Sequence, residues 1–367
     1  MIPFTKPSIS NKTIDNLKSI CRIGDVQTDG RFTIMCKDML RDLTGCKDVF
    51  FVPSCTAALE LAALAIDIKQ GDEVIIPSFT FVSSANAFVL RGAKLVYADI
   101  KLSDLNIDET QLESLITEKT KAIVPTHYGG ISCNMDFINE LAKEYSLYVI
   151  EDAAQCINSY SENGRHLGSI GDLGAISFHF TKNITCGEGG VLLVNNSDLL
   201  DKIKIARECG TNYAFNSNKY SWKDIGSSFR PSEISMAFLA TQLCEVEKIT
   251  EDRFASWIAY YRGLSELADT DLIRLADSRG MEHNAHIFYL LVNNRDKVLK
   301  KLRENGIYAT THYYPLHLSQ YGEQFYSYKL PNTEYVFNHI IRLPLWYGMS
   351  INDIEFIIDT LKNILKK

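Results

Sequence analysis

The sequence predicts an α/β protein with a mainly parallel sheet and a smaller C-terminal α+β domain. Between about residues 50 and 200, short apolar segments alternate with segments of helical propensity. These apolar segments are hydrophobic on both faces, which is typical of parallel strands that helices cover on both sides. After about residue 245 the regular alternation stops. We therefore expect a large domain over 1–245 and a small domain over 246–367, with an N-terminal segment that can pack on the small domain.

The expected elements follow in order along the chain. A helix is expected over residues 56–67, where Ala and Leu give continuous helical propensity. Six apolar strands come next, each ended by Pro, Gly or an acidic residue: Glu73–Ile76, Lys94–Tyr97, Ala122–Val124, Leu147–Ile150, Ala175–Phe178 and Val191–Val194. The second domain is expected to contain a long amphipathic helix, a strand and two further helices, at Cys244–Ala268, Ala285–Val292, Arg295–Asn305 and Asp353–Lys366.

The composition is that of an ordinary globular protein with a mild negative charge. The 367 residues include 38 Lys and Arg and 45 Asp and Glu, which gives a formal net charge of −7. Hydrophobic residues make up 46% of the chain, the usual share for a folded domain. The negative charge argues against nucleic-acid binding through bulk positive charge, but it is compatible with a local basic site for a small anion.

The nine cysteines are scattered along the chain and form no C-x-x-C pair. Their odd number and irregular spacing argue against a disulfide framework or a zinc ribbon and favour a reducing compartment. The N-terminus has no charged-then-apolar leader, and the apolar runs are far shorter than the roughly 20 residues that span a bilayer. We expect a soluble cytoplasmic protein without a membrane segment.

The eight histidines do not predict a metal site. His283 and His286 form H-x-x-H without the glutamate of a zinc-protease helix, and His312 and His317 lie five residues apart. Structural or substrate-facing roles are the expected ones for these four. His127 follows the strand at 122–124, and we assign it no catalytic role.

Two stretches place polar residues where ligands bind in a parallel sheet, at the carboxyl ends of strands. Ser54, Cys55 and Thr56 open the Ala- and Leu-rich helix. Their hydroxyls and free backbone N–H groups form either an ordinary helix N-cap or a phosphate cradle. Glu151 and Asp152 directly follow the strand at 147–150, where Asp152 either caps the next helix or keeps a buried cationic nitrogen protonated.

A third stretch carries a lysine on the same edge of the sheet. Lys182 lies just past the strand at 175–178, 182 − 152 = 30 residues after Asp152. Desolvation there would lower the lysine pKa and create a nucleophile and base, whereas the alternative is a solvated loop lysine. The glycines at 187–190 let the backbone turn closely beside it. Neither a G-x-x-x-x-G-K-[ST] loop nor a G-x-G-x-x-G after a strand is present, so both of these phosphate-binding motifs are excluded.

Together these motifs resemble one enzyme family. The segments that carry the resemblance, in their order along the chain, are SCTAAL (54–59), PSFTFVSSANAFVLRGA (77–93), VPTHYGG (124–130), EDAAQ (151–155), SFHFTKN (177–183) and GEGG (187–190). They are similar to the DegT/DnrJ/EryC1/StrS sugar aminotransferases, which are pyridoxal-phosphate enzymes with the fold-type I, aspartate-aminotransferase-like fold. The resemblance runs from Ile2 to the C-terminal helix. Within the family it points to the dTDP-4-amino-4,6-dideoxyhexose transaminases, through IPF at the start, NIDET (106–110), KYSWKDIGSS (219–228) and HYYPLH (312–317).

The resemblance implies a catalytic pair and two residues around the cofactor ring. Lys182 would bond covalently to pyridoxal 5'-phosphate and move protons during the reaction. Asp152 would keep the pyridinium nitrogen protonated, so that the ring can withdraw electrons. Gln155 would contact the hydroxyl side of the ring. Phe81 would stack on the ring, with a core aromatic as the alternative for this side chain.

The cofactor phosphate is assigned to the helix start and to a neighbouring strand end. The backbone amides of Cys55 and Thr56, the Thr56 hydroxyl and Ser177 would hold it. Many family members have G-Y-N-Y-R-M-S-E where this chain has GSSFRPSE (226–233), and the family asparagine reaches the phosphate across a dimer interface. Ser228 stands at that position. We still expect a homodimer with shared active sites. The serine side chain is shorter than that of the family asparagine, so its contact with the phosphate of the neighbouring site is either direct or through water.

The implied reaction moves the amino group of L-glutamate to C4 of dTDP-4-keto-6-deoxyglucose. The product would be dTDP-4-amino-4,6-dideoxyglucose, for O-antigen or another surface polysaccharide. Lys219 and Arg230 are candidates to hold the nucleotide diphosphate, with a surface or structural charge as the alternative for each. Tyr313 and Tyr314 are candidates to line the sugar pocket, with core packing as the alternative.

Several other activities stay open at this point. The product could be the galacto epimer, or the enzyme could act at C3 of a nucleotide sugar. A 3-dehydratase of the same family is disfavoured, because histidine replaces the lysine in those enzymes and this chain has Lys182. A non-catalytic regulator that binds pyridoxal phosphate is also disfavoured, because only Ser228 departs from the pattern of cofactor-contacting residues.

Overall fold

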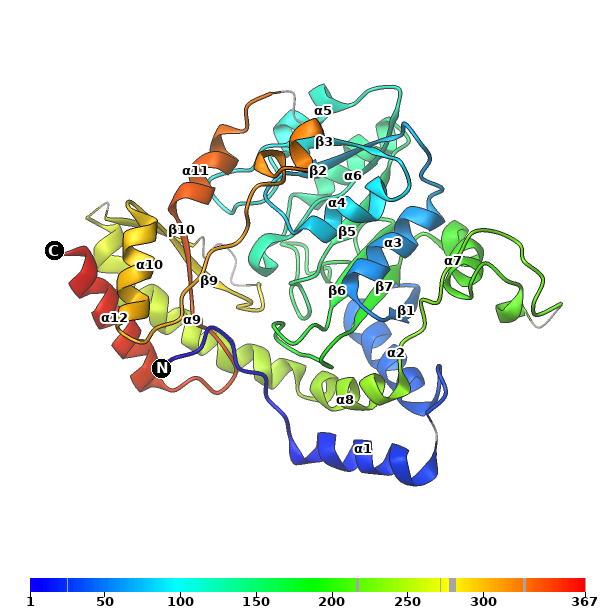
Figure 1. Ribbon diagram of the computed structural model, residues 1–367, viewed down its shortest axis with the longest axis horizontal. Coiled ribbons are helices and arrows are strands. Elements are labelled where there is room, and N and C mark those ends of the chain that lie inside the picture. The colour runs from blue at the N-terminus through cyan, green and yellow to red at the C-terminus, as the bar shows by residue number, and fades with distance from the viewer. Residues whose placement is uncertain (25, 216–217, 271, 277–281, 326–327, 367) are drawn as a thin grey trace.

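The computed structural model describes residues 1–24, 26–215, 218–270, 272–276, 282–325 and 328–366. A seven-stranded sheet in the order β1-β7-β6-β5-β4-β2-β3 lies beside a three-stranded sheet in the order β10-β9-β8 (Figure 1). The strands of the large sheet are β1 (Asp48–Val52), β2 (Glu73–Pro77), β3 (Lys94–Ala98), β4 (Thr120–Ile123), β5 (Tyr148–Asp152), β6 (Leu173–Ser177) and β7 (Gly190–Val194). The six predicted strands are all present, with bounds that differ by at most two residues.

Most neighbouring strands of the large sheet are parallel. Parallel pairing joins five consecutive strands of the sheet, β3, β2, β4, β5 and β6. β7 runs antiparallel to both β6 and β1. Antiparallel neighbours need no crossover, so the connection between β6 and β7 stays at the edge of the sheet where β6 ends. Lys182 lies in that connection. The predicted α/β class with a mainly parallel sheet is confirmed, and β1, which the sequence analysis did not predict, adds an antiparallel edge.

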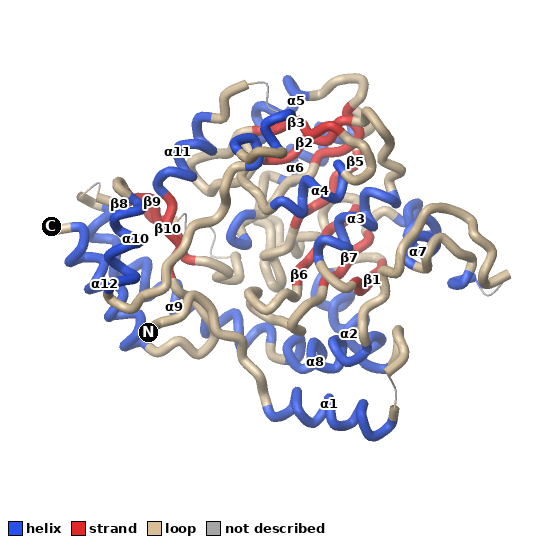
Figure 2. The backbone as a smooth tube through the Cα atoms, viewed as in Figure 1, coloured by secondary structure: helices blue, strands red, loops and turns tan. Residues whose placement is uncertain are grey.

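Helices cover both faces of the large sheet (Figure 2). Side chains alternate along the strands, so Val49 and Phe51 of β1 pack in one core and Phe50 and Val52 in the other. Helices α3, α4 and α7 pack on one side, and α2, α6 and α8, with α1 beside α8, on the other. The helices of this part are α1 (Asn11–Ile23), α2 (Arg31–Thr44), α3 (Cys55–Ala65), α4 (Val82–Val89), α5 (Leu112–Leu115), α6 (Met135–Glu144), α7 (Leu200–Arg207) and α8 (Glu233–Cys244).

The C-terminal part is built around the antiparallel three-stranded sheet. Its elements are α9 (Val246–Ala268), β8 (Ile273–Leu275), β9 (Phe288–Val292), α10 (Arg295–Glu304), α11 (Pro331–His339), β10 (Ile340–Leu343) and α12 (Ile351–Leu365). The boundary that we placed near residue 245 lies between the end of α8 and the start of α9. The core around Trp257 and Phe288 continues to Phe79 and Tyr128 of the large part, so the two sheets share packing near the strand ends.

Two segments connect the parts of the molecule. At the N-terminus the Ile2 amide donates to the Gly306 carbonyl (2.8 Å), so the first residues lie beside the small sheet while α1 lies below the large one (Figure 1). The strand predicted at Ala285–Val292 is shorter than expected and begins at Phe288. Residues 283–287 leave the sheet because they hydrogen-bond to the large part, where the Asn284 amide donates to the carbonyls of Gln155 and Ile157.

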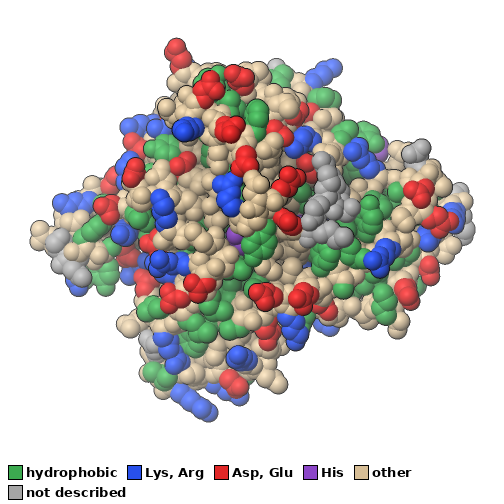
Figure 3. All heavy atoms as spheres, turned by 180° about the vertical axis from the view of Figure 1, so that it is seen from behind, with side chains coloured by type: hydrophobic (Ala, Val, Ile, Leu, Met, Phe, Trp, Pro, Cys, Tyr) green, Lys and Arg blue, Asp and Glu red, His purple; other side chains and the backbone are tan. Residues whose placement is uncertain are grey.

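The surface carries charges of both signs. Acidic and basic side chains are interspersed on the face in Figure 3, in keeping with the modest net charge of −7. All nine cysteines are free thiols. In the part of the chain that the structure describes, no helix is both long and apolar enough to cross a membrane.

Candidate active site

The carboxyl ends of β2, β4, β5 and β6 meet at one edge of the large sheet. Asp152 is the last residue of β5, Ser177 is the last residue of β6, and these strands are parallel neighbours. Thr126, just after β4, pairs with Asp152. This edge therefore gathers the residues that the sequence analysis placed after separate strands, as expected for a parallel sheet.

Asp152 is a buried carboxylate, 5% exposed, that is held by hydroxyl and backbone groups. One carboxylate oxygen accepts a hydrogen bond from the Ser84 hydroxyl of α4, and the other accepts from the Ala154 amide (3.1 Å). The Ser84 hydroxyl is in turn 3.0 Å from that of Thr80. Among the described residues Asp152 forms no ion pair. A buried carboxylate without a cation is costly, so this position fits a ligand that brings a positive charge.

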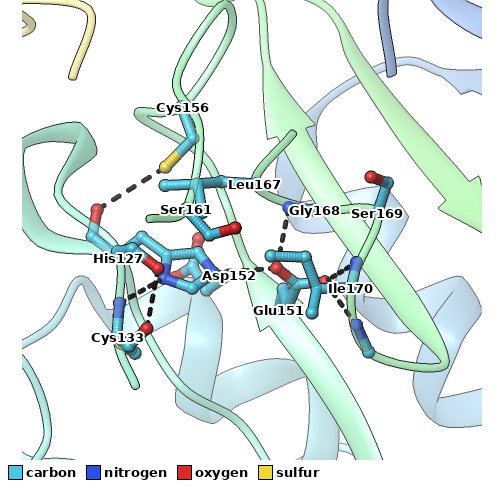
Figure 4. A network of polar contacts seen from close by, with 12 residues as sticks. His127, Cys133, Glu151, Asp152, Cys156, Ser161, Leu167, Gly168, Ser169 and Ile170 are labelled. Carbon is cyan, nitrogen blue, oxygen red and sulfur yellow. Dashed lines mark hydrogen bonds and ion pairs between the residues drawn. The ribbon is translucent and has the colours of Figure 1, made fainter. Parts of the chain in front are cut away.

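The preceding residue, Glu151, points to a different set of partners (Figure 4). Its carboxylate accepts from the amides of Gly168 (2.8 Å), Ile170 (2.7 Å) and Gly171 (2.7 Å), and it lies 2.9 Å from Nε2 of His127. Burial opposes the charge, but the bonds from His127 and the amides outweigh it and lower the Glu151 pKa. Glu151 thus fastens the turn at 168–171.

His127 has a structural role in the same network. Its Nδ1 accepts a hydrogen bond from the Cys133 amide (3.1 Å), which leaves Nε2 as the donor to Glu151. Both ring nitrogens are therefore used, and we again assign His127 no catalytic role. The described residues contain no group of three His, Cys, Asp or Glu side chains that could hold a metal ion.

Lys182 is partly buried in the connection that follows β6. Burial lowers the pKa of its ammonium group, and the positive charge of Arg342 lowers it further, against the opposing effect of Asp152. The next residue anchors the connection, because the Asn183 side chain donates to the Asn284 carbonyl (2.8 Å) and lies 2.8 Å from Nδ1 of His286. A fixed lysine with a lowered pKa is suited to act as a nucleophile and a base.

The N-terminus of α3 forms an open cradle beside the end of β6. Ser54 caps the helix by accepting from the Ala57 amide (3.1 Å). A Cβ atom at Gly190 would lie 2.4 Å from the Cys55 nitrogen, so only glycine lets β7 pass this close to the helix start. Gly190 pairs with Ser177, which places Ser177 next to the first amides of the helix. This arrangement fits a phosphate.

The two side chains after Ser54 contribute to the cradle in different ways. The Thr56 hydroxyl is 2.7 Å from that of Ser83 in α4. Burial raises the pKa of the Cys55 thiol, and the nearby charge of Asp152 raises it further, so the thiol stays neutral. Cys55 therefore offers its backbone amide rather than a thiolate to an anion.

Phe81, Tyr313 and Gln155 form a group of contacting side chains near the sheet edge that carries Asp152. Phe81, the residue before α4, is 53% exposed, so it is not a core aromatic. Its ring centroid is 6.1 Å from that of Tyr313. The Gln155 amide donates to the Tyr313 hydroxyl (2.8 Å) and its carbonyl accepts from the Gly129 amide (2.7 Å). Gln155 and Tyr313 thus hold each other in place at the mouth of the site.

Four predicted site residues lie elsewhere in the single chain. Ser228 is exposed and pairs with Glu208, and Lys219 lies 5.5 Å from the Tyr213 ring. Arg230 is 3.4 Å from the Glu208 carboxylate. Tyr314 packs against Phe337 of α11 and donates to the Leu318 carbonyl (3.2 Å). Within the described residues, none of the four contacts Asp152 or Lys182, and their roles stay predictions.

The structure adds residues that the sequence analysis missed. Ser84 could have been found from the sequence, because it follows Thr80 by one helical turn in the PSFTFVSS stretch. Arg342 also left a signal, since it is a cation in the otherwise apolar strand IIRL. Asn284 left none, because its contacts join segments that are 127 and 129 residues apart.

These features define a fold-type I architecture in which the N-terminus of α3, a lysine with a lowered pKa and a buried carboxylate lie at one sheet edge. The comparisons agree. Residues 7–362 match the model of the DegT/DnrJ/EryC1/StrS aminotransferase family. The spore coat polysaccharide biosynthesis protein SpsC of Bacillus subtilis is 32% identical, over 100% of this chain and 97% of SpsC.

Two solved structures share the whole fold. Helicobacter pylori PseC, an aminotransferase involved in the biosynthesis of pseudoaminic acid, is 25% identical, with a TM-score of 0.91 over 100% of this chain and 99% of PseC. Streptococcus pneumoniae Spr1654 in its PLP-form is also 25% identical, with a TM-score of 0.91 over 100% of this chain and 98% of Spr1654. The chain belongs to the DegT/DnrJ/EryC1/StrS aminotransferase family. It is a transaminase that depends on pyridoxal phosphate.

The described residues fit this cofactor. The α3 cradle suits its phosphate, the unpaired Asp152 suits its pyridinium nitrogen, and the lowered pKa of Lys182 suits a covalent attachment. When bound, the cofactor supplies a ring that withdraws electrons from the carbon atom that loses its proton.

Proposed function

We propose that this chain transfers the amino group of L-glutamate to C4 of dTDP-4-keto-6-deoxyglucose. The product would be dTDP-4-amino-4,6-dideoxyglucose, destined for O-antigen or another surface polysaccharide. One observation carries the reaction type: Lys182 and Asp152 lie at the same sheet edge. The pKa of Lys182 is lowered, and the buried Asp152 forms no ion pair among the described residues. A sugar as the amino acceptor is supported by the names of SpsC, a spore coat polysaccharide biosynthesis protein, and of PseC, an aminotransferase involved in the biosynthesis of pseudoaminic acid.

In this proposal different residues of the chain transfer protons, keep the cofactor ring protonated and border the substrates. The neutral amine of Lys182 removes the proton from the α-carbon of glutamate, and in the second half of the reaction it delivers a proton to C4 of the sugar. A lowered pKa keeps more of this amine neutral near pH 7. Asp152, oriented by Ser84, holds a proton on the cofactor ring. Gln155 and Tyr313, fixed to each other, border the space that the substrates enter.

We also propose a homodimer whose partner completes the substrate site. The segment that follows α7, described over 211–215 and 218–230, projects from the large sheet (Figure 1). It exposes Tyr220 by 86% and Trp222 by 79%, and exposed aromatic side chains of this kind are typical of interaction surfaces. Lys219, Ser228 and Arg230 lie on the same segment. In the dimer they would face the nucleotide diphosphate and the cofactor phosphate of the neighbouring site. Light scattering of the wild type and of Trp222→Ser tests the assembly, since the variant should shift toward the monomer.

The reaction is tested by product analysis. The protein is incubated with pyridoxal phosphate, L-glutamate and dTDP-4-keto-6-deoxyglucose, and the product is analysed by NMR. Two large couplings of the C4 proton to its ring neighbours identify the gluco product, because diaxial protons couple strongly, and two small ones identify the galacto epimer. A separate incubation with dTDP-3-keto-6-deoxyglucose tests the C3-acting alternative, because transamination places the amino group on the carbon that carries the ketone. Absence of any amino sugar, with the cofactor bound to Lys182, would refute the proposed function.

A further inference from the structure

The five residues before β9, 283–287, connect the small part of the molecule to two sides of the candidate active site. All five are buried. On the side of the small part, the guanidinium of Arg253 in α9 donates to carbonyls of this segment at 2.8 to 3.2 Å. The indole of Trp257, in the same helix, donates to a further carbonyl (3.1 Å). The segment is therefore fixed to α9.

Asn284 fixes the same segment to the large part. Its side-chain amide donates to the carbonyls of Gln155 (2.8 Å) and Ile157 (2.7 Å). Its backbone carbonyl accepts a hydrogen bond from the side chain of Asn183 (2.8 Å), the residue that follows Lys182. One residue thus holds both the Gln155 side and the Lys182 side of the site.

His286 bonds to the other end of the Asn183 side chain. The Asn284 carbonyl can only accept, so it fixes Asn183 with Nδ2 toward that carbonyl and Oδ1 toward His286. Oδ1 in turn can only accept, which makes Nδ1 of His286, 2.8 Å away, the donor. Burial lowers the pKa of His286 well below its usual value, and the charge of Lys182 lowers it further, so the ring is neutral near pH 7. A neutral imidazole has a single N–H, and the bond to Asn183 uses it.

The chain is held on both sides of Lys182. The backbone amide of Lys182 donates to the His179 carbonyl (2.9 Å), and the buried Asn183 side chain is held by the two bonds to residues 283–287. Adjacent residues are covalently joined, so a displacement of Asn183 also displaces the lysine. A shift of about 1 Å in a reacting group can cost about 10²-fold in rate. The anchoring of Asn183 therefore bears on the chemistry of its neighbour.

We propose that His286 is a positioning residue for the reactive lysine, and that its Nδ1–H group, acting through Asn183, sets the place of Lys182 relative to Gln155. This inference rests on the proposed function, in which Lys182 is the base. His286 acts only through Asn183 and contacts neither cofactor nor substrate. The Lys182 side and the Gln155 side are bonded to one short segment, and this segment keeps their spacing.

The rate of the reaction with L-glutamate tests this link in the full-length holoenzyme. The reaction is followed by the loss of the visible absorbance of the lysine-bound cofactor. In His286→Leu and in Asn183→Leu the maximal rate should fall by about 10²-fold, while the half-saturating L-glutamate concentration stays close to that of the wild type. The double variant should lose the same factor instead of about 10⁴-fold, because both substitutions break one link.

Two conservative variants separate the position of the donor from the polarity of the side chain. In His286→Asn the amide nitrogen is bonded to Cγ, as Nδ1 is, so this variant should recover most of the maximal rate. In His286→Gln the amide lies one carbon further out, and the rate should stay low. If His286→Leu does not fold, this pair gives the same answer: a high rate with Asn and a low rate with Gln support the link, and equal rates refute it.

Trp257→Phe is the matched control. It removes one hydrogen bond to the same segment, from a side chain that is also buried, and it leaves the bonds of Asn183 in place. Its maximal rate should stay close to that of the wild type. A second measurement needs no amino donor: the rate at which pyridoxal phosphate attaches to the cofactor-free protein should fall in the same variants and be retained in Trp257→Phe.

Several results would overturn the role of His286 and leave the proposed function intact. They are an unchanged maximal rate in His286→Leu, losses that multiply to about 10⁴-fold in the double variant, and an equal loss in Trp257→Phe. A raised half-saturating L-glutamate concentration at an unchanged maximal rate would show that His286 binds the donor, which also refutes positioning. If the attachment rates follow the expected order in a protein that transfers no amino group, the link is supported and the proposed function is refuted.

Discussion

Glu151 and Asp152, two neighbouring carboxylates at the end of β5, have opposite environments. On one side, Glu151 is satisfied by three backbone amides and His127. On the other, Asp152 accepts from Ser84 and Ala154 and has no cation within the described residues. The same contrast separates Arg253, whose guanidinium donates to three carbonyls, from Arg342, whose guanidinium donates to none in the part of the chain that the structure describes.

The comparison teaches how to separate structural from functional charges in this molecule. A buried charge whose partners all lie in the chain stabilises the fold when both partners are present. A buried charge that lacks partners lowers stability and is kept for a ligand. Replacing the first kind should therefore reduce stability, and replacing the second kind should reduce activity alone.

Removal of the reactive amine should have the largest effect. Lys182→Ala should lower the rate of amino transfer by on the order of 10⁴-fold, because it removes both the attachment point and the base. The visible absorbance of the lysine-bound cofactor should disappear, while the melting temperature of the cofactor-free protein stays close to that of the wild type. A variant that kept this absorbance would show that another residue is the nucleophile.

Asp152→Asn should reduce the rate of amino transfer by on the order of 10²-fold, because the pyridinium nitrogen would lose its counter-charge. Stability should not fall, because the amide oxygen can still accept from the Ala154 amide, the amide nitrogen can donate to the Ser84 hydroxyl, and the buried charge without a cation is gone. The rate and the urea midpoint are measured on the same preparation. A large loss of stability with normal activity would show that Asp152 stabilises the fold and does not act on the cofactor.

Glu151→Gln should show the reverse behaviour. The free energy of unfolding should fall by about 3 kcal/mol, because a buried charge network loses one partner, while activity per folded molecule stays near the wild-type value. The Glu151 pKa is lowered in the fold, so its stabilisation is complete above the unfolded value of about 4.3 and is lost as pH falls through the lower folded value. Urea titrations from pH 7 to pH 3 should show this acid-dependent part in the wild type and not in the variant.

The pH dependence of cofactor attachment should reveal the positive charge near Lys182. The cofactor-free protein should combine with pyridoxal phosphate faster as pH rises, up to the lowered Lys182 pKa, because the neutral amine is the reacting form. In Arg342→Gln the midpoint should move to higher pH, since a neighbouring positive charge is gone. Stopped-flow absorbance measures both profiles, and Arg303→Gln, the same substitution at an exposed position of α10, serves as the control. Identical midpoints would mean that Arg342 does not act on Lys182.

The smallest effect is expected at the aromatic wall. Phe81→Ala should weaken cofactor binding by about 3- to 10-fold, the amount that one aromatic contact contributes. Stability of the cofactor-free protein should hardly change, because Phe81 is 53% exposed. Phe79→Ala, two residues earlier but 1% exposed, should instead cost about 3 kcal/mol of stability. Equal destabilisation by both substitutions would show that Phe81 packs in the core and does not contact the cofactor.

Much of the large part could be predicted from local patterns. The six apolar segments from 73 to 194 are all strands, because residues that are apolar on both faces need a sheet with two covering layers. The same patterns placed Asp152 and Lys182 at the ends of β5 and β6. β1 (Asp48–Val52) was missed, since an apolar run this short does not by itself distinguish a strand from a buried helical segment. The strand expected from Ala285 was too long, because the Asn284 contacts with Gln155 and Ile157 could not be seen in sequence.

The fold class and the candidate reactive groups could be inferred from the sequence alone, because both depend on residues that are close together in the chain. Periodicity and propensity define strands and helices, and a residue at a strand end is placed by that strand. Only the tertiary structure decided which charges are satisfied. Glu151 and Asp152 are adjacent and chemically alike, and Arg253 and Arg342 are both buried arginines. They differ because packing brings carbonyls, amides and His127 to one member of each pair and leaves the other facing the site. Such contacts join segments that are far apart in the chain, so no local pattern encodes them.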